Sequence, residues 1–401
     1  MKTRSIISLI GGSVLQWYDF ALLGTLTPVI AQAFFPSTNE IASLLYAYAT
    51  FAISFLLAPL GALLFGHIGD RLGRKRVLTL TIILMTIPTA LIAVLPTYHD
   101  IGITASILLI ILRLAQGLAA SPEFSAASIF MVESAPKNKQ AFYGSLSTLG
   151  YSLGMILGGF VTWQVYVHFA YLAWAWRIPF ALSIVGGIIV FILRLYLIEP
   201  LPTRTRVKLP IANAFKHDKK ACLIAAGAAW YQGVLAYGIF VWSITYLHIF
   251  KHLPLSQTIL ASTLCLAANA ISQPFFGTLA DSIGKVKHLR IGLVVALIGL
   301  VSIMILLKYS NGLTTIMIGM VLLGLIIAFA LAPLNALAIL QFKPEHRMSG
   351  FGVSFNIVMA LIGGTTPLML TALFHWNETL VLVYFLIAIG IGYLMSRLIH
   401  F

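Results

Sequence analysis

Charged residues and cysteines are scarce in this sequence. Only 9% of its 401 residues are charged and 60% are hydrophobic, whereas a soluble domain carries about 25% charged residues. A soluble globular fold is therefore excluded, and the hydrophobic content equally excludes an intrinsically disordered chain. The only two cysteines, Cys222 and Cys265, both lie within apolar runs, which excludes a disulfide framework. The composition therefore indicates a membrane protein.

Long apolar runs fill the sequence. A membrane-spanning helix needs about 20 mostly apolar residues, whereas the strands of outer-membrane barrels alternate polar and apolar residues. The runs in this sequence are continuous and long enough to be helices. They cover residues 5–35, 41–66, 77–96, 101–132, 141–168, 177–199, 220–249, 257–280, 288–308, 312–341, 349–375 and 377–399. The predicted fold class is an all-α membrane protein with twelve transmembrane helices.

Lysines and arginines gather on one side of the predicted spans. All but Arg113, Arg177, Lys251 and Lys308 fall in segments that face the cytoplasm if the N-terminus is cytoplasmic. Both termini are then cytoplasmic, in a multi-pass protein of the inner (plasma) membrane. Because this bias accounts for the net charge of +14, we expect no nucleic-acid partner.

The two halves of the chain resemble each other. The longest loop, residues 200–219, is basic and rich in proline, as expected of a cytoplasmic linker between a six-helix bundle at 1–199 and another at 220–401. Phe65-Gly66 and Asp70 recur at a common offset as Phe276-Gly277 and Asp281. Parallel repeats of this kind are typical of secondary transporters, whose halves rock around a site near the bilayer midplane. We therefore predict two pseudo-symmetric bundles.

The loop after the second predicted span carries a motif, GHIGDRLGRKR at residues 66–76. Its glycines permit close helix contact and a tight turn. Asp70 can pair with an arginine or lie at the N-terminus of a neighbouring helix. Such contacts can form in one conformation and break in another, which suits a cytoplasmic gate. The predicted gate consists of Gly66, Asp70, Arg71, Gly73, Arg74 and Asp281. The segment resembles the signature loop of the major facilitator superfamily.

Further segments resemble the metabolite:proton symporter family within that superfamily. They are Trp17-Tyr18-Asp19-Phe20 with Gly24, the segments 113–117 (RLAQG) and 176–180 (WRIPF), and Glu123, Glu133, Arg347, Asn356 and Pro367. The resemblance covers nearly the whole chain and points to the proline/betaine branch. It implies proton-driven uptake of a zwitterion such as proline or a betaine, or of an organic acid. We expect no long cytoplasmic C-terminal extension of the kind that some such carriers possess.

Two positions depart from the family pattern. The family usually carries an acidic residue where this chain has Gln16, and an arginine where it has Ala58. Both positions lie at a similar depth from the cytoplasmic side. We infer that an intramembrane ion pair has been lost as a unit, because a single stranded charge is costly in a membrane. Without that arginine, a di- or tricarboxylate substrate lacks an anchor.

Three ionisable residues are predicted to lie deep in the bilayer, namely Asp19, Arg113 and Glu123. Charges at this depth are expensive and mark function or pairing. Desolvation disfavours the ionised form of a carboxylate, which suits Asp19 and Glu123 to proton coupling. Arg113 and Glu123 are too far apart along one helix for a direct pair, so Asp19 is the expected partner of Arg113. The alternative is a fixed structural network of the same three residues.

Aromatic and amide side chains are candidates for the substrate cavity. The aromatic residues of the seventh predicted span can surround a substrate ammonium through cation–π contacts, or can belong to the interfacial aromatic belt. The intramembrane amides serve equally as substrate contacts or as hydrogen bonds between helices. The predicted cavity residues are Tyr18, Gln116, Tyr231, Tyr237, Trp242, Asn269, Asn335 and Asn356.

These features predict a proton-coupled symporter that moves a small polar metabolite by alternating access. The sequence has no phosphate-binding glycine loop, no metal-ligand spacing of histidines and no nucleophile–His–acid arrangement. We therefore expect no metal, no cofactor other than the proton gradient, and no enzyme activity. The expected partners are the substrate, protons and the lipid bilayer, and we expect a monomer. Two alternatives remain open, a proton-antiporting exporter of drugs or siderophores and a membrane receptor or sensor that does not transport its ligand.

Overall fold

The computed structural model describes residues 3–38, 40–169, 171–198, 215–310 and 312–399, and the regular structure in these ranges is helical. The chain forms two compact units. Unit 1 comprises Met1–Phe130 and Gly150–Lys208, and unit 2 comprises Met131–Leu149 and Leu209–Phe401. Unit 2 thus includes a segment that lies inside the predicted N-terminal bundle. The predicted linker, 200–219, falls outside the described residues up to residue 214.

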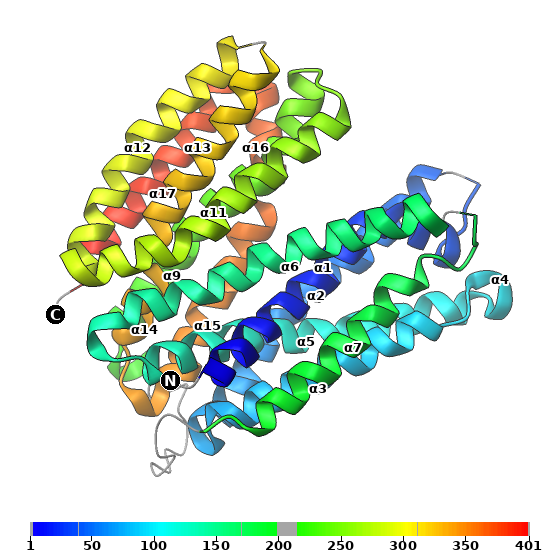
Figure 1. Ribbon diagram of the computed structural model, residues 1–401, viewed down its shortest axis with the longest axis horizontal. Coiled ribbons are helices and arrows are strands. Elements are labelled where there is room, and N and C mark those ends of the chain that lie inside the picture. The colour runs from blue at the N-terminus through cyan, green and yellow to red at the C-terminus, as the bar shows by residue number, and fades with distance from the viewer. Residues whose placement is uncertain (1–2, 39, 170, 199–214, 311, 400–401) are drawn as a thin grey trace. The chain divides into compact units, whose positions relative to one another are not determined.

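Unit 1 is built from long helices (Figure 1). They are α1 (Thr3–Phe34), α2 (Glu40–Leu72), α3 (Arg74–Val94), the short α4 (Tyr98–Ile101), α5 (Ile103–Ser134), α6 (Gln140–Phe169) and α7 (Arg177–Leu195), with a 3-10 turn, η1 (Lys137–Lys139), before α6. Helix α7 packs against both α1 and α3, and α2 packs against α1. The last turn of α5 and the first part of α6 belong to unit 2.

Unit 2 contains helices with several irregular turns. They are α9 (Lys219–Ala236), η2 (Tyr237–Trp242), α10 (Ser243–Thr245), η3 (Tyr246–Phe250), α11 (Leu255–Ile283), α12 (Lys285–Tyr309), α13 (Leu313–Leu331), α14 (Leu334–Leu340), η4 (Pro344–His346), α15 (Arg347–Val358), η5 (Met359–Gly363), α16 (Gly364–Trp376) and α17 (Glu378–Leu398). Three of these turns, η2, η3 and η5, are π-helical. Helix α13 packs between α11 and α12, and α9 packs against α15 and α17.

Each predicted apolar run coincides with helix in the part of the chain that the structure describes. Eleven helical segments there are long and apolar enough to cross a membrane. The second predicted run lies in α2, which has 33 residues. The short α4 lies between two of these segments, and η1 forms the start of the one that covers Lys137–Phe169.

Small residues decide how closely the helices of unit 1 approach. Gly150, Gly154 and Gly158 follow one another at intervals of four on α6 and face α1. A Cβ atom added at Gly154 would lie 2.4 Å from the backbone oxygen of Val14, so only glycine fits there. Such small-residue seams let helix backbones touch where lipid provides no hydrophobic driving force.

Glycine is also required at the start of α3 and at the start of α12. Gly73 precedes α3 with φ of 99°, and Gly284 precedes α12 with φ of 97°. This region of φ is disfavoured for residues with a side chain. Gly73 follows Asp70 by three residues, as Gly284 follows Asp281, so this glycine has the same backbone role in both copies of the motif.

Candidate functional site

Asp19 is the centre of a buried polar cluster in unit 1. Its side chain accepts a hydrogen bond of 2.9 Å from the Thr89 hydroxyl and one of 2.6 Å from the Ser183 hydroxyl. These donors come from α3 and α7, so the cluster joins three helices around a residue that is only 4% exposed. Buried polar groups need such partners.

Arg113 on α5 is connected to this cluster through a relay. It donates a hydrogen bond to the amide oxygen of Gln116, whose amide nitrogen donates to the Thr89 hydroxyl over 2.6 Å. The expected partnership of Arg113 with Asp19 is therefore mediated by two neutral side chains rather than by a direct ion pair. The physical reason is that Gln116 lies one helical turn from Arg113 and fills the space beside it.

The guanidinium group of Arg113 is incompletely satisfied. Arg113 is only 1% exposed, and its Nε and Nη2 atoms have no hydrogen-bond partner among the described residues. Its Cζ atom lies 6.0 Å from the centre of the Phe20 ring. Unit 1 therefore holds a buried cation with two free donors next to a buried carboxylate.

Glu123 has a different environment. Its carboxylate forms an ion pair with Arg194 of α7, in which Nη1 donates to Oε2 over 3.0 Å and Nη2 donates to Oε1. The Thr81 hydroxyl donates to the same carboxylate. Both charged side chains are fully buried, and Gly12 on α1 leaves room for them, since a Cβ atom there would lie 2.5 Å from Glu123 Oε1.

Sequence reasoning missed Arg194. It counted three buried ionisable residues in the membrane interior and assigned Arg194 to the cytoplasmic end of its span, whereas the structure buries this arginine completely. A usable signal was present, because Ser183 and Arg194 are eleven residues apart and so lie on one face of α7. The two side chains on this face bind Asp19 and Glu123 respectively.

The predicted aromatic cavity residues occupy three different environments. Tyr18 in unit 1 donates to the carbonyl oxygen of Pro179 over 2.8 Å. In unit 2, the buried ring of Tyr231 lies against Gly392 of α17, and the Tyr237 ring lies against Gly363 of η5. The Trp242 indole donates to the Thr371 hydroxyl over 3.2 Å.

The predicted amides of unit 2 bond to backbone or to serine. Asn269 donates to the carbonyl of Gly324 over 3.4 Å, and Asn335 donates to the Ser147 hydroxyl over 3.3 Å. Asn356 donates to the carbonyl of Gly352, within its own helix, over 2.7 Å. The contacts of Asn269 and Asn335 join helices, which favours the interhelical interpretation for these two residues.

The predicted gate residues lie at helix ends. In unit 1, Gly66 is buried in α2, Arg71 is exposed in its last turn, and Arg74 lies 3.6 Å from Asp70. In unit 2, Asp281 accepts hydrogen bonds of 2.9 and 2.8 Å from the backbone N–H groups of Ala141 and Phe142, at the start of α6. A carboxylate at a helix N-terminus is electrostatically favoured. Asp281, in the second copy of the motif, thus lies at the N-terminus of a helix, whereas Asp70 in the first copy lies beside Arg74.

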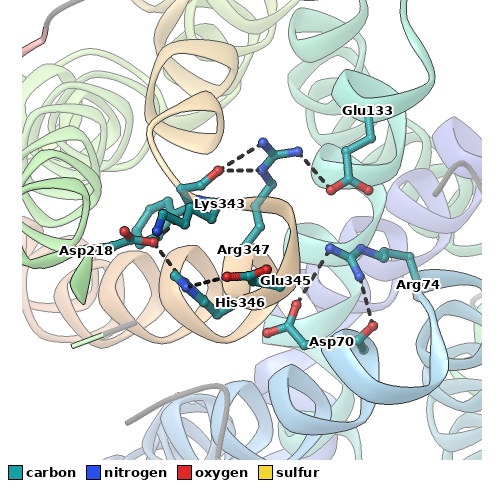
Figure 2. A network of polar contacts seen from close by, with 10 residues as sticks. Asp70, Arg74, Glu133, Asp218, Lys343, Glu345, His346 and Arg347 are labelled. Carbon is teal, nitrogen blue, oxygen red and sulfur yellow. Dashed lines mark hydrogen bonds and ion pairs between the residues drawn. The ribbon is translucent and has the colours of Figure 1, made fainter. Parts of the chain in front are cut away.

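Figure 2 shows further charged pairs at helix ends of unit 2. Arg347 donates to Glu133 over 2.9 Å and to the carbonyl of Phe342 through its other nitrogens. His346 lies 2.8 Å from the carboxylate of Asp218, just before α9. These contacts connect the starts of α9 and α15 with the end of α5.

A comparison with models of protein families identifies the kind of protein that contains these features. The model of the Major Facilitator Superfamily matches residues 9–367. The chain belongs to this superfamily. The predicted all-α membrane fold is confirmed, with eleven candidate spans in the part of the chain that the structure describes, and the chain is a multi-pass membrane transporter and not an enzyme.

Named relatives extend over most of the chain. The shikimate transporter of Escherichia coli is 31% identical and covers 96% of this chain and 91% of its own length. The glycine betaine/proline/ectoine/pipecolic acid transporter OusA of Dickeya dadantii is 31% identical, and the match covers 96% of this chain and 81% of that protein. The proline/betaine transporter of E. coli is 29% identical, and the match covers 95% of this chain and 79% of that protein. The predicted resemblance to the proline/betaine branch is thereby confirmed.

Solved structures show the same fold. The proton:xylose symporter XylE bound to 6-bromo-6-deoxy-D-glucose aligns with a TM-score of 0.77 over 98% of this chain and 94% of its own, at 15% identity. A bacterial homologue of the iron transporter ferroportin in its outward-facing state aligns with a TM-score of 0.74. At such identities the likeness concerns the fold alone.

Proposed function

We propose that this transporter is a proton-coupled symporter for a small metabolite that carries one carboxylate, either a zwitterion such as proline or a betaine or an organic acid. The observation that carries the proposal is Arg113, whose Nε and Nη2 atoms have no partner among the described residues although the side chain is buried. A carboxylate is the ligand that matches two free guanidinium donors. Shikimate, proline, betaine and pipecolic acid, which the relatives' names include, all carry this group.

The relay between Arg113 and Asp19 supports coupling to protons. A substrate carboxylate bound at Arg113 brings a second negative charge toward Asp19, and like charges favour protonation of one of the two groups. Proton binding then favours substrate binding by the same factor, because coupling between two sites is reciprocal. This reciprocal preference is the requirement for symport. The two units then alternate access to the loaded site.

Glu123 takes a different part in the proposal. Its carboxylate is already ion-paired with Arg194 and accepts a hydrogen bond from Thr81. Exchange of its proton would require breaking these contacts, so we assign proton exchange to Asp19 and assign Glu123 to fixing α5 against α3 and α7. We propose that the protein lies in the inner membrane with both termini cytoplasmic, which the distribution of lysine and arginine supports, and that it acts as a monomer.

Uptake into proteoliposomes tests the proposal. Wild-type protein is reconstituted, a pH gradient is imposed with the lumen alkaline, and accumulation of proline, glycine betaine and shikimate is measured beside that of prolinamide, which lacks the carboxylate. We expect accumulation of at least one carboxylate and none of prolinamide, and abolition of uptake by Arg113→Gln. Substrate movement against the proton flux would instead identify an exporter, and binding without movement a sensor.

A further inference from the structure

Unit 2 contains a cavity that the transport site does not use. It has a volume of about 180 Å³ and lies between the irregular turns that follow α9, the C-terminal half of α12 and the N-terminal half of α17. Leu300, Met304, Leu382 and Phe385 contribute to its apolar wall. An apolar cavity of about 150 Å³ is large enough to bind benzene, so this one can hold a segment of hydrocarbon chain.

The cavity lies between two contacts of α12 with α17. Near one end, Gly392 of α17 allows contact with Leu293 of α12, since a Cβ atom there would lie 2.8 Å from the Leu293 side chain. Near the other end, Lys308 and Glu378 form an ion pair. Between these two contacts the helices leave a space that the aromatic residues of η2 and η3 cover from one side.

The mouth of the cavity carries both signs of charge. Lys308 and Glu378 line it, and their side chains are 43% and 44% exposed, so a ligand can reach both. The Lys251 ammonium donates to the backbone oxygen of Lys308 over 2.9 Å and adds a second cation nearby. Deeper in the wall, the hydroxyl of Ser243 has no hydrogen-bond partner among the described residues.

We propose that this cavity binds one phospholipid with a zwitterionic amine head group, of the phosphatidylethanolamine type. One acyl chain fills the apolar cavity, and the head group replaces the contact between Lys308 and Glu378. Its phosphate then lies at Lys308, its ammonium at Glu378, and an ester carbonyl accepts a hydrogen bond from Ser243. With the N-terminus cytoplasmic, this end of α12 faces the outer leaflet.

Charge complementarity selects this occupant over others. A phosphatidylglycerol head group has a phosphate for Lys308 but no cation for Glu378. A phosphatidylcholine head group has a cation without N–H donors, which weakens its contact with a carboxylate. A polar metabolite would leave its own groups unsatisfied against the apolar wall.

Native mass spectrometry of the full-length protein tests the proposal. The purified transporter in detergent is titrated with phosphatidylethanolamine, phosphatidylcholine and phosphatidylglycerol that have identical acyl chains. We expect one phosphatidylethanolamine to bind about fivefold more tightly than either other lipid, which is the scale of one exposed charged contact. Met304→Trp, which fills the cavity, should abolish this bound lipid. Ile298→Trp, on a 62% exposed site of the same helix outside the cavity, is the matched control and should retain it.

A second pair of variants keeps the test decisive if Met304→Trp fails to fold. Lys308→Gln and Glu378→Gln change exposed side chains only, and Glu378→Gln should reduce phosphatidylethanolamine binding to the level of phosphatidylglycerol. Equal affinity of the wild-type protein for the three lipids would overturn the proposal. So would retention of the lipid with wild-type affinity in Met304→Trp or in Glu378→Gln.

Discussion

Replacement of Glu123 by glutamine tests the fully buried ion pair that this residue forms with Arg194 in unit 1. In Glu123→Gln the guanidinium of Arg194 stays buried and loses the charge that compensates it, together with two charge-assisted hydrogen bonds. Breaking a buried pair in this way costs about 3–5 kcal/mol. Because each 1.4 kcal/mol is a factor of ten, the folded-to-unfolded ratio should fall by about two to nearly four orders of magnitude.

Two further variants isolate this cause. Glu123→Leu combined with Arg194→Met removes both charges and keeps apolar volume, and it should return to within about 1 kcal/mol of the wild type. Glu378→Gln breaks an exposed ion pair and should cost at most about 1 kcal/mol. The free energy of unfolding is measured by titration of dodecyl maltoside micelles with sodium dodecyl sulfate, followed by tryptophan fluorescence. The reasoning is refuted if Glu123→Gln costs no more than Glu378→Gln, or if the double variant is no more stable than Glu123→Gln.

Two other predictions rest on single contacts, and a third rests on the two departures from the family pattern. Gly154→Ala should destabilise the protein by about 1–3 kcal/mol, because the added methyl group meets the backbone of α1. Gly159→Ala is the control and should leave stability unchanged, because open space surrounds Gly159. Equal melting temperatures of the two variants would contradict this prediction. Asp281→Asn should cost about 0.5–1 kcal/mol in the same unfolding assay by removing the negative charge at the start of α6, and an unchanged stability would argue against that role. Ala58→Arg should impair folding or transport, and adding Gln16→Glu should restore it; full uptake by Ala58→Arg alone would refute the paired loss of these charges.

The helices, and the glycines that precede α3 and α12, could be predicted because they depend on local sequence. Continuous apolar runs specify spans, and Gly73 and Gly284 adopt a positive φ that disfavours other residues. The burial of Asp19 and Arg113 also follows from the cost of exposing charge to lipid. These features require no knowledge of which helices are neighbours.

The partners of the buried charges could not be derived in this way. Arg194 has the same sequence signal as an arginine at a cytoplasmic span end, and only the packing of α5 against α7 shows that it meets Glu123. The π-helical turns η2 and η5 likewise depend on tertiary contact, in which the Tyr237 ring occupies the space that Gly363 leaves open. Polar residues spaced along one face of α7 were the available signal, because they implied buried polar partners on the neighbouring helices.

The central claim is that Asp19 exchanges the proton that drives uptake. The most direct measurement compares two transport modes of Asp19→Asn in proteoliposomes, namely accumulation driven by a pH gradient and exchange of labelled for unlabelled substrate at equal pH. The account predicts that exchange persists while pH-driven accumulation is lost. Accumulation by Asp19→Asn at the wild-type level under the same pH gradient would contradict it.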